Sequence, residues 1–216
     1  MSGANALRRP ADAGIDNGAN VFATRRFFDA ASATWMVKVF PGEYFVTSRT
    51  DEVLVTVLGS CVAACIRDSR TGIGGMNHFM LPQSRAGNWA GDLQSTRFGN
   101  FAMEKLINEL LKAGCSRNSL EIKVFGGGNV TDTQNAIGTE NSKFILRYLE
   151  AEGMRCAAQD LGGQLPRRIH YHPATGKVVR RLLGTSESTA VAREEGEYGS
   201  RLSTRRVAGE IQLFNE

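Results

Sequence analysis

Two apolar stretches joined by a polar turn stand out in the first half of the chain. Residues 52–58 form a nearly continuous apolar run of strand length, and this run is broken at Gly59-Ser60-Cys61. Residues 61–66 are again apolar, a polar turn follows, and residues 73–81 form a second apolar run that carries His78. Short apolar runs bounded by turn residues are typical of strands that are covered on both faces. The pattern therefore predicts a strand–turn–strand unit that carries a thiol and an imidazole.

Two other segments have apolar residues at helical spacing. The segment 96–113 follows a candidate N-cap, Ser95 or Thr96, and ends at Gly114. The segment 141–151 has one apolar face and ends before a glycine. Capping residues before an apolar period and glycine after it are the usual signals of helix ends. Both segments are predicted to be helices.

The remaining patterned segments predict mostly strands. They are 35–40 and 43–48, expected to pair around the turn Pro41-Gly42; 120–125; 154–161; and a hairpin of 168–172 with 177–183, whereas residues 25–34 are expected to form a short helix. Each of the two long helices lies between strands, which favours crossover connections, while the hairpin requires antiparallel pairing. We therefore expect an α/β protein: a single layered domain with a mixed β-sheet and at least two covering helices.

The composition changes along the chain and predicts the domain boundaries. Residues 1–24 are rich in glycine, alanine and asparagine with little apolar periodicity, and are expected to be a flexible N-terminal extension. Residues 25–184 should form the folded domain. Residues 185–216 are polar and are expected to be a largely flexible C-terminal tail.

Charge and cysteine content exclude several classes of protein. The net charge of +4 comes from dispersed basic pairs without aromatic residues between them, which argues against nucleic acid as a partner. The four cysteines have no framework spacing, so a disulfide scaffold is not expected. No segment has the length of a membrane span or the form of an export signal. These features predict a cytoplasmic protein.

Cys61 and His78 are the candidates for chemistry. A free thiol has a pKa of about 8.5, so a nucleophilic cysteine needs a neighbour that takes its proton, and histidine is the usual one. Backbone N–H groups at the break beside Gly59 would be available to an oxyanion. The alternative is structural, because cysteine is among the most buried residue types. Cys65, Cys115 and Cys156 are interpreted in that structural way.

A metal site is a second alternative. Cys61 and Cys65 could combine with His170 and His172, and the spacing of the two cysteines is permissible for zinc. No loop or glycine knuckle lies between the cysteines, so we expect no metal. The triplet Gly126-Gly-Gly128 lacks the order of a phosphate-binding loop and predicts a tight turn or a close backbone approach to the site.

Five sequence blocks together resemble one family. They are Leu58-Gly-Ser-Cys-Val-Ala-Ala-Cys65, Gly74-Gly-Met-Asn-His-Phe-Met-Leu-Pro82, Val124-Phe-Gly-Gly-Gly-Asn-Val130, Ile137-Gly138 with Asn141, and Asp160-Leu-Gly-Gly163. In this order, over roughly residues 40–183, they resemble the chemotaxis protein family CheD, the chemoreceptor glutamine deamidases. The resemblance implies a fold similar to that of bacterial toxin deamidases.

The resemblance also implies an activity and a site. It implies an amidohydrolase that converts glutamine side chains of methyl-accepting chemotaxis receptors to glutamate through a cysteine thioester, without a metal or organic cofactor. The family nucleophile falls on Cys61, its histidine on His78, and the threonine of its site on Thr56. Some family members bind a CheC-type phosphatase, and the polar segment 83–96 is expected to dock the receptor. A non-catalytic adaptor that uses the same cleft is the alternative from another class.

Overall fold

The computed structural model describes residues 25–82, 93–130 and 135–204. The strands are β1 (Arg25–Asp29), β2 (Thr34–Lys38), β3 (Tyr44–Thr47), β4 (Glu52–Leu58), β5 (Val62–Asp68), β6 (Gly74–Asn77), β7 (Leu120–Gly126), β8 (Cys156–Leu161), β9 (Arg167–His172) and β10 (Lys177–Leu182). The helices are α1 (Leu93–Lys112), the 3-10 turn η1 (Arg117–Ser119), α2 (Asn135–Ala151) and α3 (Thr185–Thr204). None of the helices in these ranges combines the length and the hydrophobicity of a membrane-spanning segment.

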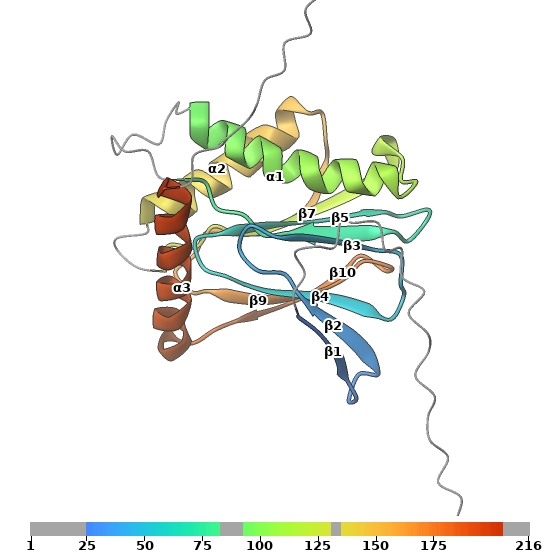
Figure 1. Cartoon of the computed structure of the whole chain (residues 1–216), viewed down its shortest axis with the longest axis horizontal. Coiled ribbons are helices and arrows are strands. Elements are labelled where there is room, and N and C mark those ends of the chain that lie inside the picture. Colours follow the sequence, from blue (N-terminus) through green and yellow to red (C-terminus); the bar gives the residue numbers. More distant parts are fainter. Residues whose placement is uncertain (1–24, 83–92, 131–134, 205–216) are drawn as a thin grey trace, which may run out of the picture.

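The strands form two five-stranded sheets that lie one above the other, with α1 and α2 on the outer face of one of them (Figure 1). The first sheet has the order β1-β2-β4-β9-β10, in which only β2 and β4 are parallel. The second has the order β3-β6-β5-β7-β8, in which only β7 and β8 are parallel. The predicted α/β class, with mixed pairing and covering helices, is confirmed.

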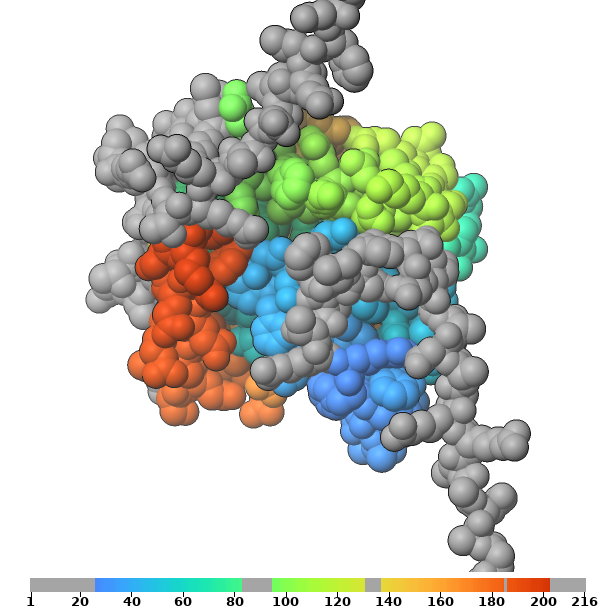
Figure 2. All heavy atoms as spheres, in the orientation of Figure 1, coloured from blue at the N-terminus to red at the C-terminus, as the bar shows by residue number. Residues whose placement is uncertain are grey.

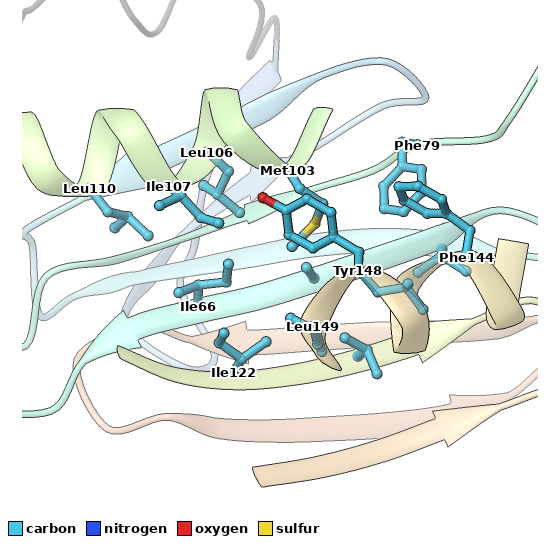
Figure 3. Close-up of a cluster of buried hydrophobic side chains, with 14 of the residues drawn as sticks. Ile66, Phe79, Met103, Leu106, Ile107, Leu110, Ile122, Phe144, Tyr148 and Leu149 are labelled. Atoms are coloured by element: carbon cyan, nitrogen blue, oxygen red, sulfur yellow. The ribbon is translucent and has the colours of Figure 1, made fainter. Parts of the chain in front are cut away.

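Strand β5 separates two hydrophobic cores. Its residues Val62, Ala64 and Ile66 face α1 and α2, whereas Ala63 and Cys65 face the space between the sheets. Side chains of a strand alternate between its two faces, so a strand buried on both faces is apolar throughout. Figure 3 shows the helix-side core, in which Met103, Leu106, Ile107 and Leu110 of α1 and Phe144, Tyr148 and Leu149 of α2 pack with Ile66, Phe79 and Ile122. This double burial explains the unbroken apolar runs on either side of Cys61.

Two local predictions in the N-terminal part were wrong. Residues 25–34 are not helical: they contain β1 and a turn, and β1 pairs with β2. The segments 35–40 and 43–48 do not pair with each other, because β2 lies in one sheet and β3 in the other. Gly42, with a φ of 85°, lies where the chain crosses between the sheets rather than in a hairpin. A turn signal marks a change of direction, but it does not say which strand the next one joins.

The C-terminal prediction was wrong for residues 185–204, which form α3. This helix stands across one end of both sheets (Figure 1) and buries Glu195 and Leu202. Polar composition suggested a flexible tail, but one face of the segment packs on the domain and so stabilises the helix. The expected N-terminal extension, residues 1–24, lies outside the described residues, and so do residues 205–216. Residues 83–92, which are most of the expected docking segment, also lie outside them.

Candidate functional site

Cys61 and His78 lie beside each other at the end of the inter-sheet core. Val62 and Phe79, the residues that follow them, exchange two backbone hydrogen bonds of 2.9 Å, so Cys61 and His78 project to the same face of this bridge. The Cys61 Sγ and a His78 ring nitrogen are within 4.8 Å of each other. Both residues are fully buried, at 0% and 2% exposure. The structure therefore brings together the two residues that the sequence indicated separately.

Thr56 fixes the orientation of the imidazole. Its hydroxyl lies 2.8 Å from His78 Nδ1 and donates a hydrogen bond of 2.7 Å to the Val39 carbonyl oxygen. A hydroxyl has one hydrogen to donate, so it must accept from Nδ1–H. This assigns the hydrogen of the neutral ring to Nδ1 and leaves Nε2 unprotonated. Among the described residues, Nε2 has no hydrogen-bond partner and is free to take a proton.

Burial keeps both members of the pair neutral. It lowers the pKa of His78 to about 4, against an ordinary value near 6.5. Burial also raises the pKa of the Cys61 thiol well above its usual range, and the negative charge of Glu195 raises it further. Removing water disfavours the charged form of each group. In this conformation the pair is a thiol beside a neutral base.

The carbonyl oxygens of the loop that carries Cys61 are held from one side. Gly128 N–H and Gly127 N–H donate 2.7 Å hydrogen bonds to the carbonyls of Gly59 and Cys61. The Asn141 side-chain amide donates a 2.8 Å bond to the carbonyl of the residue between them, Ser60. The glycine triplet is thus a brace for this loop, which agrees with the expected close approach and not with a phosphate cradle.

The same loop directs three consecutive N–H groups to its other side, where they meet a carboxylate from α3. The Glu195 oxygens accept hydrogen bonds from the backbone N–H groups of Gly59 at 2.8 Å, Ser60 at 2.6 Å and Cys61 at 3.2 Å. They also accept one from the Ser60 hydroxyl at 2.7 Å. Successive N–H groups that converge in this way form an anion-binding nest. We call the three backbone N–H groups of residues 59–61 the N–H nest.

A second set of contacts lies beside the glycine triplet. Arg167 is only 2% exposed, and its guanidinium donates to the carbonyl oxygens of Asp160, at 2.7 Å, and Gly162. The next residue, Gly163, accepts a 2.7 Å hydrogen bond from Asn129 N–H. The Asp160–Gly163 block is therefore tied to the end of the glycine triplet.

The alternative metal set is not assembled. Cys65 is buried in the inter-sheet core, whereas His170 and His172 are half-buried on β9. Across the described ranges, the one group of three candidate ligands within 4.8 Å is Cys61, His78 and Glu195. The four donors on the Glu195 carboxylate already match its roughly four lone-pair directions, so it is suited to be a bound anion more than a metal ligand.

Glu195 is the residue that the sequence interpretation missed. The signal was a one-sided pattern in the polar tail: Val191, Glu195, Tyr198 and Leu202 recur at helical spacing. The helix glycines and the many surrounding charges obscured this pattern. A carboxylate on the packed face of such a helix is a sign of a partner elsewhere in the chain, because lone buried charges are costly.

Comparisons with known proteins agree on one family. The CheD family profile, described as CheD chemotactic sensory transduction, matches residues 80–182. A protein of Rhodopseudomonas palustris (strain BisA53), named probable chemoreceptor glutamine deamidase CheD, is 51% identical over 89% of this chain and 90% of its own length. Proteins of the same name from Hahella chejuensis and Herminiimonas arsenicoxydans are 44% and 48% identical, over 89% and 90% of this chain and 91% and 96% of their own lengths.

Proposed function

Because the chain belongs to the CheD family, we propose that it deamidates glutamine side chains of chemoreceptors by covalent catalysis at Cys61. Its relatives are named for chemoreceptor glutamine deamidation, which indicates the substrate class. The observation that carries the mechanism is the N–H nest beside a thiol and an unprotonated imidazole nitrogen. Nucleophile, base and oxyanion donors are the three components that acyl transfer requires.

The first half of the reaction forms a thioester. His78 Nε2 takes the Cys61 proton as the sulfur attacks the glutamine carboxamide carbon, and the carboxamide oxygen becomes an oxyanion. Once the Glu195 carboxylate has left it, the N–H nest stabilises this oxyanion, and the loop itself needs no rearrangement because its carbonyls are already braced. His78 then returns the proton to the departing nitrogen. The carbon–nitrogen bond breaks and ammonia leaves.

The second half restores the enzyme. A water molecule gives a proton to His78 Nε2 and attacks the thioester carbon, the carbon–sulfur bond breaks, and the proton returns to the Cys61 sulfur. Thr56 acts through His78: it keeps Nε2 unprotonated in the resting state and stabilises Nδ1–H while the ring is charged. The product is a glutamate side chain, and neither step calls for a cofactor.

The proposal is tested by ammonia release from the purified cytoplasmic domain of a chemoreceptor. The wild-type protein should release ammonia, and Cys61→Ala and His78→Ala should each reduce the rate by at least about 10²-fold. Cys156→Ala is the matched control, because Cys156 is a half-buried thiol on β8 away from the site. Activity retained in Cys61→Ala would overturn the proposal.

A further inference from the structure

The N–H nest is occupied by a carboxylate of the chain's own α3. Glu195 is 2% exposed and accepts all three N–H groups of the nest and the Ser60 hydroxyl, although it lies more than a hundred residues after Cys61 in the sequence. Its oxygen is also within 4.8 Å of both the Cys61 sulfur and a His78 ring nitrogen. A glutamate carboxylate at this position has the chemistry of the product of glutamine deamidation.

One face of α3 covers the site around that carboxylate. Val191 packs against Gly59, and Tyr198 lies so close to Gly42 that a Cβ there would collide with its hydroxyl. Leu202 is buried in the inter-sheet core. These contacts place α3 over Cys61, which has no exposed surface. No substrate side chain can reach the sulfur while α3 is in this position.

The electrostatic effect of α3 also opposes catalysis. The Glu195 carboxylate is held beside the Cys61 thiol, where its negative charge disfavours a second negative charge on sulfur. Accordingly, burial and the Glu195 charge both raise the pKa of the Cys61 thiol. Departure of α3 would admit water, remove that charge and empty the N–H nest for an oxyanion.

The helix has features of an element that can detach. It contains Gly196 and Gly199, and glycine inside a helix is less favourable than alanine. Gly184 connects it to β10, and a Cβ on Gly184 would meet nothing within 4 Å. Figure 2 shows α3 as a ridge on one side of the molecule. Its departure would leave the pairing of both sheets unchanged.

We propose that α3 is an intramolecular occupant of the substrate site, with Glu195 at the position of the product glutamate, and that a substrate helix must displace it. This inference rests on the proposed function for its chemistry. The displacing partner is a helix that presents a glutamine side chain, because the surface it must fill is the one that α3 fills as a helix. The protein is therefore closed at rest and opened by the partner it modifies.

The first test measures alkylation of Cys61 by iodoacetamide at neutral pH, with peptide mapping to separate it from the other cysteines. Glu195→Ala should raise the rate at least tenfold, because it removes the anion from the nest. Glu194→Ala, at an exposed neighbouring position, should leave the rate unchanged. Tyr198→Ala should also raise it, since it weakens α3 packing without touching the nest. Equal rates in wild type, Glu195→Ala and Tyr198→Ala would overturn the proposal.

Hydrogen exchange separates release of α3 from general unfolding. In Glu195→Ala, amides of residues 185–204 should exchange faster while those of α1 keep their wild-type protection. Faster exchange in both helices would mean that the substitution only destabilises the domain, and would overturn the proposal. A zinc ion at Cys61, His78 and Glu195 would also slow alkylation, so wild type is measured with and without a chelator. Acceleration by the chelator would overturn the proposal.

The second test uses Glu195→Gln, which places a carboxamide where Glu195 lies. The full-length variant should hydrolyse this side chain, with loss of ammonia and a mass gain of about 1 Da at residue 195. The double variant with Cys61→Ala should keep the carboxamide. Retention of the carboxamide at position 195 by a variant that still deamidates the receptor would overturn the assignment of the product position. If neither the carboxamide at position 195 nor the receptor is deamidated, the proposed function fails. Alkylation of Cys61 and hydrogen exchange of α3 still decide whether α3 occupies the site.

Discussion

The Thr56 hydroxyl lies 2.8 Å from His78 Nδ1 and donates its own hydrogen to the Val39 carbonyl, so it can only accept from the ring. This relationship gives the imidazole one tautomer, with Nε2 free on the side of the thiol. The first prediction follows from it.

Thr56→Val keeps the shape of the side chain and removes the acceptor for Nδ1–H. We expect the turnover number to fall about 10- to 100-fold with little change in KM, because the ring loses its tautomer preference and its support when charged. Thr56→Ser restores the hydroxyl and should recover most of the activity. The direct readout is the ¹⁵N spectrum of His78, which should show Nδ1 protonated in wild type and a tautomer mixture in Thr56→Val. An unchanged spectrum would contradict this role.

The glycine triplet gives a prediction with an internal control. Gly126 has a φ of 111°, and a Cβ there would collide with the Cys61 carbonyl oxygen; Gly153, at the end of α2, has a φ of 62° with nothing within 4 Å. Both alanine variants carry strain from the positive φ, which is roughly 1–2 kcal/mol for Gly153 in the left-handed region. Only Gly126→Ala should also displace Cys61 and lose activity. Urea unfolding and ammonia release measured on both variants separate the two effects, and equal activities would contradict the bracing of the Cys61 loop.

Stabilising α3 should slow the alkylation of Cys61, whereas removing the Glu195 carboxylate should accelerate it. Gly196 is exposed in the middle of the helix, so Gly196→Ala should stabilise α3 by about 0.5–1 kcal/mol. If α3 must leave before Cys61 reacts, alkylation should slow by about two- to fivefold. The control is Asn108→Ala at an exposed position of α1, which should stabilise that helix without affecting Cys61. An alkylation rate that does not respond to Gly196→Ala would show that the thiol reacts without opening of α3.

The burial of His78 predicts the direction in which the free energy of unfolding changes with pH. Burial lowers the pKa of His78 to about 4, below the value near 6.5 expected in the unfolded chain. Between these values the unfolded state binds more protons, so the free energy of unfolding should decrease as the pH falls from about 6.5 to 4. The contribution of His78 to this decrease in the free energy of unfolding should be of the order of 3 kcal/mol.

The matched variant for this experiment is His78→Gln, which cannot titrate. Urea unfolding at several pH values should show a shallower decrease in the variant. His170 and His172 have pKa values lowered by burial as well, so part of the decrease should remain. A variant with the full wild-type decrease would contradict a neutral, buried His78.

Local sequence patterns predicted the strands that carry this site, but they did not predict the contacts between residues far apart in the chain. The apolar runs on either side of Cys61 predicted β4 and β5, because double burial leaves a local pattern. Helices α1 and α2 were predicted with their C-terminal ends correct to within one residue, but α1 begins three residues and α2 six residues before the predicted start. The sequence did not predict that the chain crosses from one sheet to the other at Gly42, because strand pairing depends on partners that are distant in the chain.

Glu195 shows the same limit in the site itself. Its partners lie 134 to 136 residues away, and its own segment has the composition of a solvated tail. Most of the stability of a helix in a protein comes from tertiary packing, and intrinsic helix propensity does not report tertiary packing. By contrast, Cys61 and His78 lie at the ends of β5 and β6, and they meet because these two strands pair. Thr56 reaches His78 from β4 of the other sheet, and this contact between sheets joins residues only 22 positions apart.

The central claim is that Cys61 turns a receptor glutamine into glutamate, and peptide mass spectrometry of the receptor tests it most directly. Receptor cytoplasmic domain incubated with the wild-type protein should contain specific glutamines that gain about 1 Da, as hydrolysis of the carboxamide requires. The same peptides should stay unchanged with Cys61→Ala and convert normally with Cys156→Ala. Conversion by Cys61→Ala, or no conversion of any receptor glutamine by wild type or by the open Glu195→Ala variant, would contradict the account.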